Sequence, residues 1–378
     1  MDSTTQQSTH ICLVSSQPTP NLVAACDPEH KPSKVILVFD PPMRQRAEWL
    51  SQVFAGRQIE SEMWTISNPY DYAHIRLRLE ELLARQDLGS LKLNATGGTK
   101  VMSLAAHGLF RERQLPIFYV QPDKDLLIPL FPEESPKEIP DRLKLPEFLQ
   151  AHGYQVTGLR RETISSGRQQ LGRTLLENLT SFEKALGPLN YLAGTAEGRP
   201  SLESDTITIQ HLATKGFEDL VALFSQENLL IQEHGRLRFA SEAERFFVNG
   251  GWLEEYLFAR VGRLRNRLKI QDAAMSVSIQ SPGGTPNEID MAILHNNRLH
   301  LIECKTRQMA NGNGAGTGAL YKIDSLRDLG GHTSRALIAS YRKLANYDQR
   351  RARDLGVALV CAKDLLSVEE IMENWLTT

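Results

Sequence analysis

The sequence has few cysteines, no marked excess of charge and no long apolar run. Its four cysteines, at positions 12, 26, 304 and 361, include no CxxC pair, which excludes a disulfide framework and a clustered zinc site. A formal net charge of −2 excludes a globally basic nucleic-acid binder, although a local basic surface is compatible with it. No apolar run approaches the roughly 18 residues of a membrane span. We therefore expect a cytoplasmic protein that makes no membrane contact.

The first part of the chain alternates between short β-branched runs and amphipathic segments. Strands are expected at 10–15, 34–40, 62–66, 91–96 and 116–121, and helices at 43–55, 70–86 and 98–113. Apolar strands separated by helices indicate βαβ units and a parallel sheet covered on both faces. The sequence thus predicts an α/β, Rossmann-like domain over residues 1–135. Because GxGxxG and GxxxxGK[ST] are both missing, NAD and P-loop nucleotide binding lose their main support.

The clearest binding signal in this domain is NATGGTKVMS (94–103), where a strand ends and a helix opens. Backbone N–H groups and hydroxyls at such a helix N-terminus form an anion site. In a doubly wound sheet, ligands bind at the carboxyl ends of the strands, where the loop SSQPTPN (15–21) also lies. A simple glycine-rich turn is the alternative. The residues that would supply the anion site are Thr96, Gly97, Gly98, Thr99 and Lys100.

The middle of the chain, residues 136–248, carries fewer signals. It begins rich in proline and charge, which favours a linker. Residues 208–248 contain a helical stretch followed by a hairpin that turns at His234 and Gly235. Helices followed by a small hairpin are typical of a winged helix, although the pattern is common in other folds. We interpret 136–248 as a linker with a winged-helix-like connector.

The last part of the chain, residues 249–378, is predicted to form an αβα domain. A hairpin is expected over 287–306 with its turn at Asn296-Asn297. The glycine-rich stretch 311–318 that follows is either a mobile gate or a simple connector. The remaining expected elements are a helix at 251–268, a strand at 276–280, a helix from about 320, strands at 335–340 and 357–361, a helix at 343–355 and a final helix.

The hairpin carries three charged residues in a pattern that suggests catalysis. Glu303 and Lys305 are two apart on the second strand, so both side chains lie on one face. The turn brings Asp290, on the first strand, back beside Glu303. A solvated edge hairpin is the alternative, but the charges stand in the otherwise apolar run LHLIECKT, where they need a reason.

Two neighbouring carboxylates are costly unless a cation lies between them. Hard oxygen ligands of this kind suit Mg²⁺ or Mn²⁺. Such a metal lowers the pKa of a bound water and neutralises charge that develops on a phosphodiester oxygen. Lys305 would position or deprotonate the water or stabilise the transition state. Asp290, Glu303 and Lys305 therefore predict metal-dependent hydrolysis.

At this point the chain resembles the PD-(D/E)xK, or restriction-endonuclease-like, superfamily. The resemblance implies that Asp290, Glu303 and Lys305 are catalytic and that an acid on the opening helix is a further metal ligand, which falls on Glu254 or Glu255, with Glu254 preferred. Glu288 would flank the site. Other residues proposed near the cleft are Tyr321 and Lys322, and a basic face for phosphates would comprise Arg260, Arg263 and Arg267.

With the TGGTK loop added, the chain resembles the CARF-domain nucleases of type III CRISPR systems that have one CARF and one nuclease domain. The resemblance implies that the N-terminal domain binds a cyclic oligoadenylate, above all cyclic tetra-adenylate, across the two-fold axis of a homodimer. A ring with repeated phosphates suits two identical anion loops related by a dyad. The first loop would contribute Ser15, Gln17, Thr19 and Asn21, and Asp40 and Met43 would reach the adenines.

The leading interpretation is an endonuclease that cyclic tetra-adenylate activates and that uses Mn²⁺ or Mg²⁺. It would cleave single-stranded DNA or RNA, or nick duplex DNA, with little sequence specificity. A cyclic-oligoadenylate-responsive transcription regulator that binds nucleic acid through the winged helix is the alternative from another class. A restriction-type enzyme that ignores second messengers is a third, but it leaves TGGTK unexplained.

Overall fold

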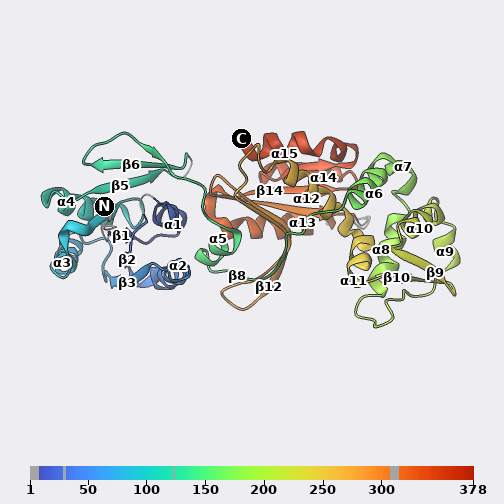
Figure 1. Ribbon diagram of the computed structural model, residues 1–378, viewed down its shortest axis with the longest axis horizontal. Helices are drawn as coiled ribbons and strands as arrows, with labels where there is room; N and C mark the ends of the chain where they lie inside the picture. The colour runs from blue at the N-terminus through green and yellow to red at the C-terminus, as the bar shows by residue number, and fades with distance from the viewer. Residues whose placement is uncertain (1–7, 29–30, 122–123, 307–314) are drawn as a thin grey trace, which may run out of the picture.

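The computed structural model describes residues 8–28, 31–121, 124–306 and 315–378. Three parts follow one another along its longest axis: the N-terminal domain, the C-terminal domain and a mainly helical unit built from the middle of the chain (Figure 1). The C-terminal domain therefore lies between the two parts that precede it in sequence. Within the described ranges, no helix is long and apolar enough to cross a membrane.

The N-terminal domain is a seven-stranded sheet in the order β3-β2-β1-β4-β5-β6-β7. The strands β3, β2, β1, β4 and β5 pair in parallel. β6 pairs antiparallel with β5, and β7 pairs antiparallel with β6. Because β1 pairs with both β2 and β4, the loops after β1 and β4 flank the topological switch point. The Rossmann-like prediction is confirmed. The elements are β1 (Thr9–Leu13), α1 (Thr19–Cys26), β2 (Lys34–Phe39), α2 (Arg44–Gly56), β3 (Glu60–Thr65), α3 (Tyr72–Leu83), β4 (Leu91–Asn94), α4 (Lys100–Glu112), β5 (Ile117–Gln121), β6 (Leu126–Phe131) and β7 (Lys137–Glu138).

Helix α1 replaces part of the loop that was expected over 15–21. It begins at Thr19, because Pro18 and Pro20 preset the backbone φ for a first helical turn. Thr19 and Asn21 are consequently buried. The Asn21 amide donates a hydrogen bond to the Leu13 carbonyl at 3.0 Å, which ties the start of α1 to the end of β1.

The C-terminal domain is a six-stranded mixed sheet in the order β15-β14-β13-β12-β11-β8. Helices α12 and α15 pack on one face, and α13 and α5 pack on the other. The elements are α5 (Leu145–Ala151), β8 (Gln155–Arg160), α12 (Trp252–Leu264), β11 (Asp272–Gln280), β12 (Pro286–His295), β13 (Arg298–Lys305), α13 (Ala315–Arg327), β14 (Arg335–Ser340), α14 (Asn346–Asp354), β15 (Ala358–Cys361) and α15 (Val368–Thr377). Of the glycine-rich stretch, 311–314 lies outside the described residues, while Gly316 and Gly318 belong to α13 rather than to a loop.

The unit at the far end contains a short strand pair and several small helices. Ser204 and Ile207 donate backbone hydrogen bonds to β10 and to Gly235, so residues 202–207 run along the hairpin. The helices α9 and α10 lie in sequence between this segment and the β9–β10 hairpin, an order that agrees with the predicted winged-helix-like connector. The elements are α6 (Ser166–Glu177), α7 (Leu179–Phe182), α8 (Leu186–Thr195), α9 (Ile209–Leu212), α10 (Phe217–Gln226), β9 (Leu230–Glu233), β10 (Arg236–Phe239) and α11 (Glu242–Phe246).

Two strands from the expected linker, 136–248, belong to the flanking sheets. β7 extends the N-terminal sheet, and β8 pairs antiparallel with β11 at the edge of the C-terminal sheet. The sequence prediction missed β8 because it stands alone, and its partner lies more than a hundred residues later. Helix α5, just before β8, packs against α2 and so joins the two domains.

The junction between the domains is one continuous apolar core. Leu37 and Phe54 of the N-terminal domain, Phe148 of α5, and Leu301 and Ile338 of the C-terminal sheet all belong to the same buried cluster. Polar contacts reinforce this core. The Leu145 backbone N–H donates to Asp272 at 2.9 Å, and Arg161 donates to both oxygens of the same carboxylate. The two domains therefore share a core instead of meeting through a flexible linker.

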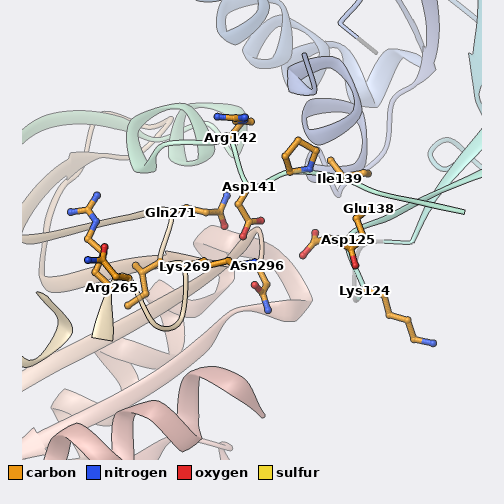
Figure 2. A pocket seen from close by; sticks show the side chains of 13 residues that line it. Lys124, Asp125, Glu138, Ile139, Asp141, Arg142, Arg265, Lys269, Gln271 and Asn296 are labelled. Atoms are coloured by element: carbon orange, nitrogen blue, oxygen red, sulfur yellow. The ribbon is translucent and has the colours of Figure 1, made fainter. Parts of the chain in front are cut away.

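A cleft of about 810 Å³ opens beside this junction (Figure 2). Asp141 lies in it near Lys269 and Gln271. The Asn297 side-chain amide donates to Asp141 at 3.2 Å and to Asp125 at 2.9 Å. Burial raises the pKa of Asp141 to about 6, and the positive charge of Lys269 only partly opposes this. The ionised carboxylate therefore opposes folding at neutral pH.

We expect Asp141→Asn to stabilise the protein at pH 8, because asparagine keeps an acceptor oxygen for Asn297 and removes the buried charge. The pKa of Asp141 is higher in the folded than in the unfolded chain, so the wild type gains stability as the pH falls through about 6. The variant should gain about 1 kcal/mol at pH 8 and lose about half of that advantage at pH 5. Urea unfolding at both pH values measures this; a variant less stable at pH 8 would contradict it.

Candidate active site

The hairpin β12–β13 brings the predicted residues together. Its turn residues Asn296 and Asn297 both have positive φ, 48° and 51°, as a two-residue turn of this hand requires. Pairing between the strands ends at Met291 and Ile302. Beyond that point the Cys304 backbone N–H donates to the side chain of Asp290 and not to the β12 backbone. The distance from Cys304 N to Asp290 Oδ2 is 2.6 Å. Asp290 is thereby held next to Glu303.

Glu303 is the buried centre of the site, with 1% of its surface exposed. Lys305 Nζ donates to Glu303 Oε1 at 2.5 Å. Lys322 of α13 donates to both Glu303 oxygens, at 2.9 and 2.8 Å, and its Nζ lies 3.8 Å from Asp290 Oδ1. Two carboxylates and two ammonium groups thus form one charged cluster at the end of β13.

The environment of the cluster changes the pKa values of Asp290 and Lys305. Burial, and then the negative charge of Glu303, raise the pKa of Asp290 to about 6, although Lys305 and Lys322 oppose the shift. Burial alone would lower the pKa of Lys305, but the charges of Glu303 and Asp290 outweigh it and the pKa rises. Lys305 therefore stays an ammonium group that can hold a proton or an anionic oxygen in place.

Helix α12 offers two adjacent glutamates, and the structure separates their roles. Glu255 is 1% exposed and pairs with Arg168 at 2.7 Å and Arg160 at 3.2 Å, away from the charged cluster. Burial, followed by the charges of Asp290 and Glu288, raises the pKa of Glu254 to about 9. Glu254 is thus the helix acid that faces the site.

Ser276 belongs to the site but was missed by sequence analysis. It adopts a φ of 47°, in the left-handed region that is unusual for serine, in the middle of β11. Its hydroxyl lies 3.3 Å from Glu254 Oε2. Strained backbone of this kind collects at functional sites and aims a side chain that a regular strand would direct elsewhere. The residue type alone carried no signal for this conformation.

Other residues expected near the site are arranged differently. Tyr321 packs on Arg351 of α14 and does not join Lys322. Glu288 is exposed on β12, but its charge contributes to the raised pKa of Glu254, so it does flank the site.

Two arginines of the predicted basic face pair with acids. Arg263 and Arg267 form ion pairs with Glu369 and Glu373 of α15, and Arg260 is buried over the Tyr256 ring. The Arg263 and Arg267 side chains are still 56% and 57% exposed, so the phosphate-binding face remains a prediction for these two, whereas Arg260 is buried.

The donor chemistry of the cluster fits a hard divalent cation. Asp290 and Glu303 are adjacent carboxylates, the pKa of Asp290 is raised by desolvation and then by the charge of Glu303, and Glu254 adds a third oxygen donor nearby. As the side chains stand, no three His, Cys, Asp or Glu residues in the described ranges have the spacing of a complete metal site. Asp290 and Glu303 therefore carry the metal prediction.

The loops at the switch point of the N-terminal sheet lie together as expected. Gly97 packs directly over the Leu13 carbonyl oxygen, and Gly98 has a φ of 73°, so both positions require glycine. Lys100 is exposed in the first turn of α4. In the other loop, the Ser15 hydroxyl and the Gln17 backbone hydrogen-bond each other at 3.3 Å, which fixes the turn after β1.

Several hydroxyls and amides in these loops are already used within the protein. Thr99 caps α4 by accepting from the Met102 backbone N–H at 3.1 Å, and it donates to the Pro69 carbonyl. Thr96 donates to Asn94 and accepts from the Val120 backbone. Asn21 also contacts Asn94, at 3.0 Å. These side chains shape the loops, whereas the Lys100 side chain is exposed.

Comparisons with known families agree with this division. Residues 9–148 match the family described as the Card1 CARF domain, and residues 240–378 match the family described as the Card1-like endonuclease domain. The chain is thus a CARF-domain nuclease with one sensor domain and one endonuclease domain. The comparison with curated proteins gave no match.

Solved structures of similar proteins extend over nearly the whole chain. The structure of protein VC1899 from Vibrio cholerae is 29% identical, with a TM-score of 0.86 over 98% of both chains. Can2 from Sulfobacillus thermosulfidooxidans, solved with cyclic tetra-adenylate, is 27% identical, with a TM-score of 0.81 over 98% of this chain and 99% of that chain. A type III CRISPR defence DNA nuclease activated by cyclic oligoadenylate is 18% identical, with a TM-score of 0.59 over 90% of this chain and 46% of that chain, and supports the fold alone.

The different roles of Glu254 and Glu255 can be tested by the effect of each on the free energy of unfolding. Because the pKa of Glu254 is raised by folding, its ionised form opposes folding at pH 7, and Glu254→Gln should stabilise the protein by about 2 kcal/mol. Glu255→Gln should instead destabilise it by about 2 kcal/mol, since Arg160 and Arg168 lose their buried counter-charge. Thermal unfolding in EDTA compares the pair, and a loss of stability in both variants would show that Glu254 is only structural.

Proposed function

We propose that this protein is a metal-dependent endonuclease of type III CRISPR defence that cyclic tetra-adenylate activates. The observation that carries the proposal is the buried Glu303 carboxylate, bonded to Lys305 beside Asp290, in an endonuclease domain that shares its core with a CARF domain. The likeness to Can2, which was solved with cyclic tetra-adenylate, supports the choice of activator.

Asp290 and Glu303, with Glu254 as third donor, would hold Mg²⁺ or Mn²⁺. When bound, such a metal activates water and neutralises charge on the scissile phosphate. Lys305 would hold a proton or an anionic oxygen next to the reacting phosphate, which suits its raised pKa. The Cys304 backbone keeps Asp290 oriented toward Glu303.

The substrates we propose are single-stranded DNA, single-stranded RNA and duplex DNA, in which the enzyme would nick one strand. The reasoning is that carboxylates, metal and lysine act on the phosphodiester group that these nucleic acids share, and not on base edges. Little sequence specificity is expected for the same reason. A cleavage assay with all three substrates determines which of them the enzyme prefers.

For the sensor, we propose that cyclic tetra-adenylate binds over the loops after β1 and β4. Ser15, Gln17 and the backbone of Gly97 and Gly98 would contact the ring, together with Lys100 at the start of α4, where a helix N-terminus favours phosphate. Thr19, Asn21, Thr96 and Thr99, all engaged or buried within the protein, would hold these loops in shape.

We further propose that the protein is a homodimer joined through α3 and α4. Exposed apolar side chains gather on and before these helices, on a part of the sensor next to the proposed ligand loops. Tyr70 is 74% exposed and Leu104 is 67% exposed, and Tyr72 and Leu77 are also exposed. A second copy related by a two-fold axis would cover them and bring two anion loops to one ring.

The transcription-regulator alternative depends on the winged-helix-like unit. In a winged helix the second helix of the pair reads the major groove. Here that helix is α10, whose first turn exposes Glu218 and Asp219. Two carboxylates repel the DNA backbone, so this unit is a poor reader of DNA and the nuclease interpretation is preferred.

The central test is cleavage by the purified full-length protein with cyclic tetra-adenylate and Mn²⁺ or Mg²⁺. We expect Glu303→Gln and Lys305→Ala each to lower the cleavage rate at least about 100-fold, because each removes a group at the reacting phosphate. Glu370→Gln, which changes an exposed acid on α15, is the matched control and should cleave normally. Cleavage that survives in Glu303→Gln, or in excess EDTA, would refute the proposed chemistry.

The dimer is tested by the mass of the protein in solution. Leu104→Asp should convert a dimer to a monomer and weaken binding of cyclic tetra-adenylate at least about tenfold, since it places charges in the apolar interface. Ile209→Asp is the control, because Ile209 is 85% exposed but lies in the distal unit. Light scattering gives the mass; equal masses for both variants would argue against the α3–α4 interface.

A further inference from the structure

The sensor loop after β1 touches the endonuclease domain directly. The Gln17 side chain packs on Gly331, in the 3₁₀ turn η4 (Asp328–Thr333). A Cβ atom added to Gly331 would lie 2.6 Å from Gln17 Nε2 and 2.8 Å from its Cδ, so the Gln17 side chain would have to move to admit it. Gly331 also has a φ of 74°, which independently favours glycine.

The same segment of chain reaches the active site at its other end. η4 directly continues helix α13, and α13 carries Lys322. Lys322 Nζ bonds both oxygens of Glu303 at 2.9 and 2.8 Å and lies 3.8 Å from Asp290. One uninterrupted segment thus links a sensor-loop side chain to the central carboxylate of the site.

Packing makes this segment a rigid connection. Leu320, Ile323 and Leu326 of α13 and Leu329 of η4 are buried in the core that the two domains share. At Gly330 a Cβ atom would come within 2.8 Å of Leu299 Cβ on β13. Close-packed elements move as units and do not deform gradually, so a shift imposed at Gly331 is carried to Lys322.

We propose that Lys322 is a positioning residue for Glu303 and that the Gln17–Gly331 contact sets its position according to the state of the sensor loop. This inference rests on the proposed function. The ring would act on the loop that holds Gln17, favour one placement of η4 and α13, and so orient Glu303 through Lys322. The ligand can shift this equilibrium only as far as it binds one placement better than the other.

Two kinds of variant test the proposal at saturating cyclic tetra-adenylate. Lys322→Gln should lower kcat for nucleic-acid cleavage at least tenfold while KM and ring binding stay within about twofold, and Lys322→Arg should recover part of kcat. Gly331→Ala and Gln17→Ala should each reduce the stimulation of cleavage by the ring at least fivefold. Both variants lose the Gln17–Gly331 contact, and a saturating ring concentration offsets any weaker ring binding by Gln17→Ala. The double variant should therefore lose no more than the more affected single variant.

Gly318→Ala is the matched control for the glycine replacement. Gly318 lies in α13, the helix that η4 continues. It is exposed, and a Cβ atom there would meet nothing within 4 Å, so stimulation should be unchanged. Thermal unfolding of every variant separates a folding defect from a loss of coupling. Gln17→Ala, in addition, introduces no steric clash.

The results distinguish this inference from the proposed function. If the ring does not stimulate the wild-type enzyme, the proposed function fails. Suppose instead that the ring stimulates the wild type. The coupling through Gln17 and Gly331 is then refuted if neither Gly331→Ala nor Gln17→Ala loses stimulation. It is also refuted if the two losses of stimulation multiply in the double variant. If Lys322→Gln keeps the wild-type kcat, the positioning role of Lys322 is refuted.

Discussion

The burial of a negative charge at the end of β13 is the constraint on which the rest of the site depends. Glu303 is nearly inaccessible, so its charge must be balanced within the protein. The balance comes from one lysine on its own strand and another on α13, while the Cys304 backbone supports the neighbouring Asp290. Every element around the site, from the hairpin turn to the packing of α13, serves to keep these groups together.

What the sequence predicted well depends on short-range geometry. The alternation of Glu303 and Lys305 and the Asn296–Asn297 turn are local, so the hairpin and its charged face follow from the sequence alone. The order of strands and helices in the N-terminal domain follows from the same kind of pattern. The resemblance to CARF-domain nucleases was likewise carried by two short motifs, and the family comparisons agree with it.

What the sequence could not predict depends on contacts between distant segments. The positive φ of Ser276, the pairing of the buried Glu255 with Arg168, and the pairing of β8 with β11 arise only once the sheet has assembled. In the sequence, Arg260, Arg263 and Arg267 recur at the spacing of one helix face. In the structure, Glu369 and Glu373 of α15 pair with Arg263 and Arg267. Likewise, Gln17 and Gly331 are more than three hundred residues apart, and no pattern relates them.

The core shared by the two domains also bears on how such proteins diversify. Helix α5 and the residues around it belong at once to the sensor and to the nuclease sheet. Exchange of one sensor domain for another during evolution would therefore expose apolar surface unless the replacement brought a matching face for α5. Lineages with this architecture should inherit sensor and nuclease as a single module, with sequence change concentrated in the loops and in the distal helical unit.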